Sequence, residues 1–67
     1  MIEFKFGDAL RYPKDQDPDD EPNWVFMFLG DRGRWIDTVL IRVHWQDDQW
    51  TAGEVIAAAP HELELIQ

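Results

Sequence analysis

The length, composition and charge of this chain exclude several classes of protein. Its 67 residues, 45% of them hydrophobic and 13% aromatic, suffice for one small folded domain. The absence of Cys excludes disulfides and thiolate zinc sites, and a formal net charge of −8 disfavours direct binding to nucleic acid or to an anionic membrane surface. Neither a signal-peptide core nor an apolar run of about 20 residues is found, so we expect a cytoplasmic protein.

The first predicted element is a β-strand over residues 2–12, because apolar and charged residues alternate there with a period of two. Gly7 predicts a bend within this strand, since glycine adopts backbone conformations that other residues avoid. The residues predicted to share its apolar face are Ile2, Phe4, Phe6, Leu10 and Tyr12. A long acidic loop is expected next, over residues 13–23.

Two further strands are expected in the middle of the chain. Residues 24–29 are apolar on both faces and predict the second strand, which should end at a glycine turn over residues 30–33. Residues 38–45 alternate again and predict the third strand. Its apolar face carries Val39, Ile41, Val43 and Trp45, whereas Leu40, Arg42 and His44 lie on the other face.

A polar loop over residues 46–49 is predicted to join the third strand to a fourth strand over residues 50–57. This loop would set Trp45 directly opposite Trp50, as a cross-strand pair of indole rings. The two strands together would then form a long hairpin with a tight polar tip.

The register of that hairpin predicts an irregularity in the fourth strand. Continued along both strands, it would set Ile41 against Glu54, an apolar residue against an acid. A β-bulge near Gly53 would repair the mismatch by turning Val55 inward, because a bulge inserts one extra residue and glycine often marks such sites. We therefore predict a bulge at Gly53.

The chain is predicted to close with a short turn and a fifth strand. Pro60 ends any longer run, and residues 60–63 predict a single 3₁₀ turn. Residues 62–66 alternate acidic and aliphatic side chains, which predicts a closing strand with Leu63 and Leu65 toward the core.

This order of elements resembles the small SH3-like β-barrel. The opening GDALRY and the terminal HELELI bracket three meandering strands, and the similarity covers nearly the whole chain. Proteins of this shape include short phage and bacterial proteins and modules of the KOW and Tudor types. The resemblance implies an all-β fold, with residues 1–67 forming a single five-stranded barrel that binds partners rather than catalysing a reaction.

The residue types present exclude most catalytic chemistry. The chain has neither Ser nor Cys, so the two commonest activated nucleophiles are missing, and no glycine-rich phosphate loop occurs. His44 and His61 have no acidic or His partner at metal-ligand spacing on the same strand. We therefore expect no enzyme, no catalytic residue and no cofactor.

The acidic loop imitates the beginning of a calcium-binding loop. Asp15, Asp17 and Asp19 have the required alternate spacing. The pattern then fails, because Asp20 stands where a Gly is needed and Phe26 stands where a bidentate Glu is needed. We expect no metal site, and the loop is either a solvated connection or a docking surface for a basic partner.

Two surfaces are candidates for contact with a partner protein. One is the acidic loop, and the other is aromatic, because one face of residues 24–29 is exposed unless both faces are covered. The predicted partner-binding residues are Asp15, Asp17, Asp19, Asp20, Glu21, Trp24, Phe26, Phe28, Trp35, Trp45 and Trp50. Among the aromatic residues, Trp35 is the one we most expect to have an exposed ring. A cage for a methylated cation is an alternative, built from Tyr12, Trp35 and Trp50 beside Asp37.

Three functions remain open. The leading hypothesis is a non-enzymatic interaction module, phage-encoded by resemblance, that binds and modulates a host protein in the cytoplasm. One alternative is an acidic nucleic-acid mimic that inhibits a DNA- or RNA-binding host protein, and another is a structural subunit that self-associates through the second strand or an exposed edge. We expect a protein partner, a basic one if the acidic loop takes part, no direct contact with nucleic acid or membrane, and a monomer or weak homodimer.

Overall fold

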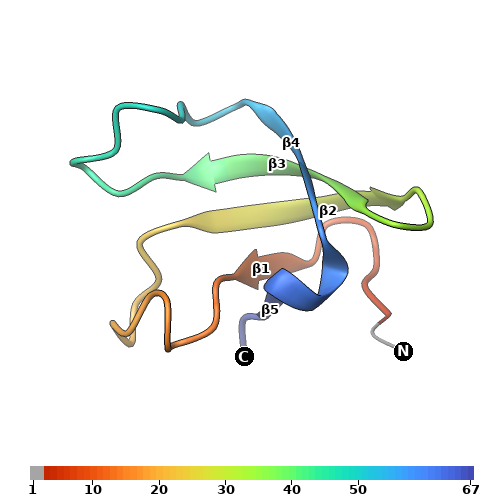
Figure 1. The fold of residues 1–67 in the computed structure, drawn as a ribbon, viewed down its shortest axis with the longest axis horizontal. Coiled ribbons are helices and arrows are strands. Elements are labelled where there is room, and N and C mark those ends of the chain that lie inside the picture. Colours follow the sequence, from red (N-terminus) through yellow and green to blue (C-terminus); the bar gives the residue numbers. More distant parts are fainter. Residues whose placement is uncertain (1–2) are drawn as a thin grey trace.

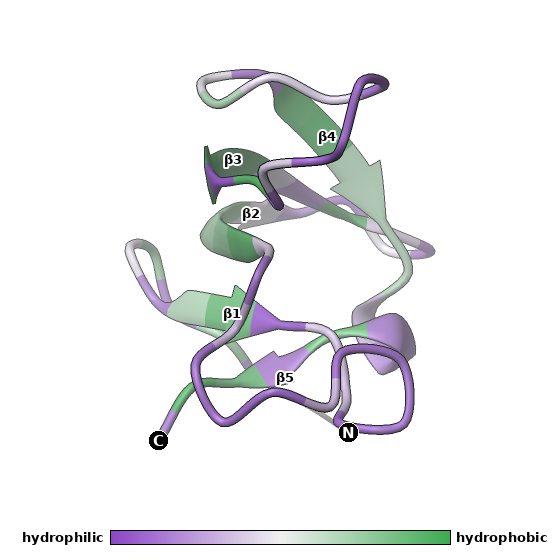
Figure 2. Ribbon diagram, turned by 90° about the vertical axis from the view of Figure 1, so that its left-hand side faces the viewer, coloured by the Kyte–Doolittle hydropathy of each residue, from purple (hydrophilic) through white to green (hydrophobic). Residues whose placement is uncertain are grey.

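The computed structural model describes residues 3–67, which form one antiparallel sheet of five strands (Figure 1). The elements are β1 (Ala9–Arg11), β2 (Val25–Asp31), β3 (Ile36–Arg42), β4 (Val55–Ala58), the 3₁₀ helix η1 (Pro60–Glu62) and β5 (Glu64–Leu65). The strands lie in the order β4, β3, β2, β1, β5, which runs from top to bottom in Figure 2. The all-β class, the five strands and the 3₁₀ turn before the last strand are therefore confirmed.

The sheet has two edges, β4 and β5. β4 pairs with β3 and β5 pairs with β1, and no pairing joins β4 to β5 within residues 3–67, so closure into a barrel is not shown. The radius of gyration, 11.2 Å, matches the roughly 11 Å expected for a compact chain of this length. In the described part of the chain, no helix is long and apolar enough to cross a membrane.

Alternate residues of the central strands supply the core, all on one face of the sheet. Leu10 pairs with Phe26, and Phe26 pairs with Leu40, so these three side chains lie side by side. The buried apolar side chains are Leu10, Phe26, Phe28, Ile36, Leu40 and Leu63. Thr38 is also buried, and its hydroxyl donates a hydrogen bond of 2.7 Å to the carbonyl of Ile56 in β4. At about 1.5–3 kcal/mol for each large apolar side chain, this cluster is the main source of stability.

The predicted apolar face of the third strand is wrong for Val39, Ile41 and Trp45, because β3 turns its other face to the core. Val43, just beyond the end of β3, does pack against the core as predicted. β3 begins at Ile36 and buries Ile36, Thr38 and Leu40, whereas Ile41 is 51% exposed. Both faces of this strand carry apolar residues, and the strands that pair with it determine which face is buried. Phe26 pairs with Leu40, which fixes the even-numbered face against the core.

The loop between β3 and β4 is longer than predicted and spans residues 43–54. Trp45 and Trp50 form no ring contact with each other, so the predicted tryptophan pair is wrong. The bulge is confirmed: the N–H of Leu40 donates to the carbonyl of Glu54 at 2.8 Å, while the N–H of Gly53 donates to the carbonyl of Leu40 at 2.7 Å. Gly53 has φ 97°, which favours glycine.

The bulge was predicted to turn Val55 inward, and this part of the prediction is wrong. Val39 pairs with Val55, and Thr38 pairs with Ile56, so Ile56 follows the buried Thr38 to the core face. Val55 lies on the outer face, where it is 67% exposed.

The opening strand is shorter than predicted. Gly7, at φ 88°, and a turn in which the N–H of Asp8 donates to the carbonyl of Lys5 separate β1 from the preceding residues. Phe4 packs against the core as expected, but Phe6 is 75% exposed because this turn directs it away. The predicted position of Ile2 lies outside the described residues.

The closing strand is also short, since η1 occupies the residues before it. Leu63, directly after η1, is buried as predicted. Leu65 pairs with Leu10 but remains 38% exposed, because β5 is the outermost strand on that side of the sheet.

Candidate binding surface

Two loops meet at one end of the sheet, because β2 and β3 are antiparallel. The loop of residues 12–24 leads into the start of β2, and the loop of residues 43–54 leaves the end of β3, so both lie on the left in Figure 1. Trp35 lies in the turn at the opposite end, about 20 Å away along the seven residues of β3. The two loops carry most of the aromatic side chains that the core does not use.

Four rings from these loops form a continuous series, called here the aromatic column: Tyr12, Trp24, His44 and Trp45. At its inner end, the ring centroid of Tyr12 lies 5.2 Å from that of the buried Phe26 and 5.9 Å from that of Trp24. Trp24 stacks on His44 at 5.3 Å, and His44 stacks on Trp45 at 5.7 Å. The column therefore runs from the core to solvent, where Trp45 is 83% exposed.

Asp47 fixes the second loop against the aromatic column. Its Oδ2 accepts the indole N–H of Trp24 at 2.8 Å, and its Oδ1 accepts the backbone N–H groups of Gln49 at 2.8 Å and Trp50 at 3.1 Å. The hydrogen bond from Trp24 is the largest of the effects that hold the pKa of Asp47 below its ordinary value. Asp47 is therefore a fixed negative charge at neutral pH.

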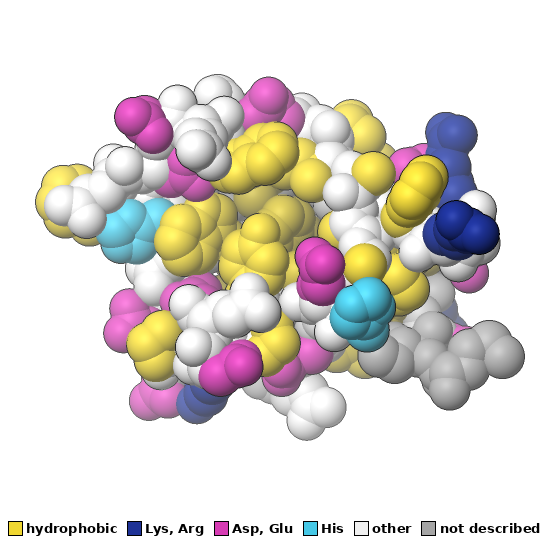
Figure 3. Space-filling model, viewed as in Figure 1, with side chains coloured by type: hydrophobic (Ala, Val, Ile, Leu, Met, Phe, Trp, Pro, Cys, Tyr) yellow, Lys and Arg dark blue, Asp and Glu magenta, His cyan; other side chains and the backbone are white. Residues whose placement is uncertain are grey.

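A hollow of about 460 Å³ opens between the two loops. Its lining residues are Tyr12, Trp24, His44, Gln46, Asp47, Asp48, Gln49 and Trp50. Burial, followed by the negative charges of Glu62 and Asp47, raises the pKa of Tyr12, so its hydroxyl stays neutral. Figure 3 shows hydrophobic side chains gathered on this face, with acidic ones around them. The lining thus combines aromatic rings with carboxylates and contains neither Lys nor Arg.

A second hollow, of about 570 Å³, lies toward the turn between β2 and β3. Its lining residues are Glu3, Phe4, Lys5, Phe28, Asp31, Gly33, Ile36, Pro60 and His61. Acidic and basic side chains offset each other around it, so it favours neither an anionic nor a cationic ligand. The hollow between the two loops is lined by carboxylates without Lys or Arg, so its preference for a cationic ligand is clearer.

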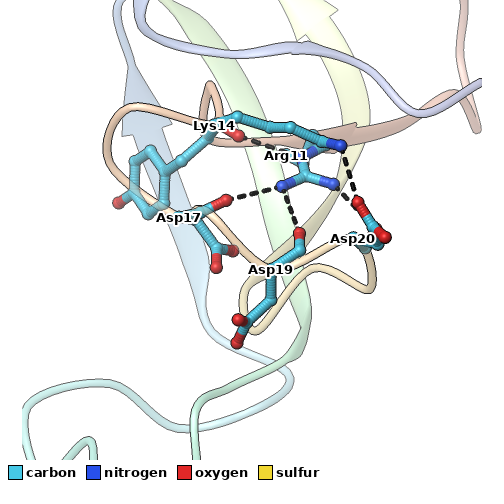
Figure 4. A network of polar contacts seen from close by, with 6 residues as sticks. Arg11, Lys14, Asp17, Asp19 and Asp20 are labelled. Carbon is cyan, nitrogen blue, oxygen red and sulfur yellow. Dashed lines mark hydrogen bonds and ion pairs between the residues drawn. The ribbon is translucent and has the colours of Figure 1, made fainter.

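The acidic loop is held in place by Arg11, which is only 6% exposed (Figure 4). Its guanidinium donates to the backbone carbonyls of Asp17 at 2.7 Å, Asp19 at 3.0 Å and Asp20 at 3.1 Å. Its Nε–H also donates to the carbonyl of Tyr12 at 3.0 Å. Hydrogen bonds from a charged donor are stronger than neutral ones. The loop therefore wraps its backbone around one buried cation.

Asp17 is the structural acid of this loop and is 1% exposed. Its carboxylate accepts the backbone N–H of Asn23 at 2.9 Å and the side-chain amide of Asn23 at 2.8 Å. Burial opposes ionisation of Asp17, but the hydrogen bonds from Asn23 outweigh it, and the pKa lies below its ordinary value. Among residues 3–67, no three acidic or His side chains are grouped so that they could hold a metal ion.

The remaining acids of the loop are on its surface. Asp20 pairs with Lys14 at 2.8 Å, a hydrogen bond that lowers the pKa of Asp20, and Glu21 pairs with Arg42 at 2.6 Å. Exposed pairs of this kind contribute about 0–1 kcal/mol each. The loop is consequently less free to meet a partner than its composition indicates, because two of its surface acids already face cations of the same chain.

The predicted partner-binding residues fall into separate groups. Phe26 and Phe28 are buried in the core, so neither offers a surface to a partner and their assignment was wrong. Trp24, Trp45 and Trp50 come together at the loop end of the sheet. The acidic residues that stay exposed are Asp15, Asp19, Asp20 and Glu21, whereas Asp17 is buried.

The predicted cage is only half assembled. Tyr12 and Trp50 line the same hollow, but Trp35 and Asp37 lie toward the opposite end, where Asp37 accepts a hydrogen bond of 2.6 Å from Arg32. Trp35 is 52% exposed, which confirms the prediction of an exposed ring there, and Trp45 is more exposed still, at 83%.

Sequence reasoning missed the polar residues that organise the surface. Asp47 was predicted only as part of a polar loop, although an Asp side chain that accepts the backbone N–H two residues later, as Asp47 does from Gln49, is a typical turn feature. Arg11 and Asn23 carried no signal that could have identified them, because the loop must fold before their partners come within reach. Those partners are backbone carbonyls for Arg11 and the carboxylates of Asp17 and Asp19 for Asn23.

Comparisons of this chain with protein-family models, with curated proteins and with solved structures found no match.

Proposed function

We propose that this protein is a non-enzymatic interaction module that holds a basic segment of a partner protein in the hollow between its two loops. The observation that carries the proposal is the combination of the aromatic residues Tyr12, Trp24 and Trp50 with the acids Asp47 and Asp48 in one lining. A Lys or Arg side chain placed there would meet aromatic rings and negative charge together.

The physical basis is the attraction of a cation to the face of an aromatic ring, which is worth about 0.5–2 kcal/mol depending on how far the site excludes water. Asp47 contributes a fixed charge, because its oxygens already accept three hydrogen bonds. Asp48 is exposed and lies at the same hollow, where it can pair with an incoming guanidinium or ammonium group. The net charge of −8 would also steer a basic partner toward the protein.

We also propose that the five-stranded sheet belongs to an SH3-like barrel. A strand order of β4, β3, β2, β1, β5, with a 3₁₀ turn before the last strand, supports an SH3-like barrel as the architecture. The resemblance of the sequence to short phage proteins supports a phage origin, with a bacterial host protein as the partner that is bound and modulated in the cytoplasm.

Mimicry of nucleic acid has less support than binding of a basic segment. A mimic requires free carboxylates at a phosphate-like spacing, about 7 Å along one strand. In the acidic loop, Asp17 is buried, Asp20 faces Lys14 and Glu21 faces Arg42. Few charges of the loop are therefore left for a groove-shaped partner.

Replacing one exposed tryptophan at a time tests the proposal. Trp50 and Trp35 are similarly exposed, at 42% and 52%, but only Trp50 lines the hollow. For binding of a short peptide of alternating Arg and Gly, Trp50→Ala is expected to raise Kd by about tenfold or more, as for a central interface residue. The matched control, Trp35→Ala, should change Kd by less than about twofold. Equal effects of the two variants, or equally tight binding of an alternating Glu and Gly peptide, would contradict the proposal.

A further inference from the structure

The outer edge of β4 carries backbone groups that nothing in the described chain satisfies. Leu40 exchanges hydrogen bonds with the bulge at Gly53 and Glu54, and the antiparallel ladder then directs the backbone of Ile56 and Ala58 toward β3. The N–H and C=O groups of Val55 and Ala57 consequently point away from the sheet. Within residues 3–67, no loop or side chain forms a hydrogen bond with them.

This edge lacks the features that usually prevent strands from pairing with other chains. Natural edge strands are protected by charged side chains, by Pro, or by a covering loop. β4 has the sequence VIAA, without a charge or a Pro, and Val55 and Ala57 are both exposed. In Figure 2 β4 forms the upper end of the sheet, beyond β3. The strand is therefore open to an added strand along its whole length.

We propose that two copies of this protein pair through β4, antiparallel, about a two-fold axis at Ile56. In this arrangement Val55 of each copy lies opposite Ala57 of the other, and the outward N–H and C=O groups of both residues exchange hydrogen bonds. The register follows from β4 itself, because its two outward residues are placed symmetrically about Ile56. The same surface serves both copies, so no other partner is needed to complete it.

The apolar character of the outer face supports this pairing. Ala9 pairs with Met27, Met27 with Val39 and Val39 with Val55, which gives an apolar row across four strands on the face opposite the core. Val55, at 67% exposed, ends this row at the open edge. Pairing with a second β4 would place Ala57 of the other copy beside it and continue the row across the two-fold axis.

The proposed dimer is weak and is strengthened by salt. A strand of four residues buries less than the roughly 800 Å² per partner of a standard interface, so pairing is expected only at high protein concentration. Two chains of charge −8 repel each other, and at about 0.01 M salt the screening length of about 30 Å reaches across a molecule whose longest dimension is 31 Å. At about 1 M salt the screening length falls to about 3 Å and the repulsion is removed.

Sedimentation equilibrium of the intact protein at low and high salt tests the pairing. The wild type should be a monomer at about 0.01 M salt and should dimerise at about 1 M salt. Ala57→Pro removes one outward donor from each copy, and Pro is tolerated on the free side of an edge strand, so Kd should rise by at least about tenfold. Ala57→Val keeps the donor and should dimerise at least as well as the wild type.

A second pair of variants separates edge pairing from stacking of the outer faces. Val55→Glu and Ile41→Glu each add one negative charge to the outer face, but only Val55 lies on β4. Val55→Glu should raise Kd by at least about tenfold, and Ile41→Glu by no more than about threefold. A monomeric wild type at about 1 M salt, unchanged pairing in Ala57→Pro, or equal losses in the two Glu variants would overturn the proposal. Peptide binding at the hollow is measured separately, so its failure and the failure of pairing are distinguishable.

Discussion

Replacing Arg11 by Met would show how much of the stability depends on one buried guanidinium. Arg11→Met keeps a long apolar side chain but removes four hydrogen bonds to backbone carbonyls. Each bond from a charged donor is worth about 1.5–3 kcal/mol when its loss leaves a buried acceptor unpaired. The carbonyls at the loop surface regain water, and the bond to the carbonyl of Asp17 is the buried one. We therefore expect a loss of about 3 kcal/mol, close to the value of one or two such bonds.

A loss of this size is large for 67 residues, whose total stability is about 3–10 kcal/mol at roughly 0.05–0.15 kcal/mol per residue. Urea unfolding followed by tryptophan fluorescence measures it. Arg42→Met is the matched control, because the side chain of Arg42 is 50% exposed and, within residues 3–67, its one ion pair is with Glu21, at 2.6 Å. The control should lose less than about 1 kcal/mol. Equal losses in both variants would refute the view that Arg11 anchors the loop.

Three further variants test the acid, the bulge and the core face. Because the pKa of Asp17 is depressed in the folded protein, its carboxylate stabilises the fold at pH values above its unfolded pKa of about 3.9. This stabilisation is lost as the pH falls through the folded pKa, and acid unfolding of Asp17→Asn should lack that loss. Gly53→Ala should lower the free energy of unfolding by about 1 kcal/mol or more, because Gly53 has φ 97°. Gly30→Ala changes a glycine without positive φ and should not have this effect, so similar melting temperatures of the two variants would contradict the prediction. Leu40→Ala should cost about 2–5 kcal/mol and Ile41→Ala less than about 1 kcal/mol in urea unfolding, with the reverse order arguing for the odd-numbered face.

The sequence predicted the number and order of the strands because their signals are local. Alternation, glycine turns and Pro60 each act over a few residues, and the 3₁₀ turn and the bulge at Gly53 appear where those signals placed them. The core face of β3 could not be predicted in the same way. Val39 and Ile41 on one face are as apolar as Ile36 and Leu40 on the other. Pairing with β2 determines which of the two faces is buried.

The candidate surface could be predicted only in part, because it too depends on contacts between segments that are distant in the sequence. The predicted pairing of Trp45 with Trp50 was wrong, and Trp24 and Trp50 line one hollow only because the antiparallel sheet brings the two loops together. The acidic loop was read from its charge alone. Its conformation depends on Arg11, a residue that the alternation pattern treats as an ordinary exposed cation.

The four indole N–H signals of the tryptophans provide the most direct test of binding at the hollow. They can be followed separately in ¹H–¹⁵N NMR spectra while a short peptide of alternating Arg and Gly is added. We expect saturable shifts of the signals from Trp24, Trp45 and Trp50, with the Trp35 signal unchanged, since Trp35 lies about 20 Å away along the sheet. Shifts confined to Trp35, or equal small shifts of all four signals, would contradict a cation-binding site between the two loops.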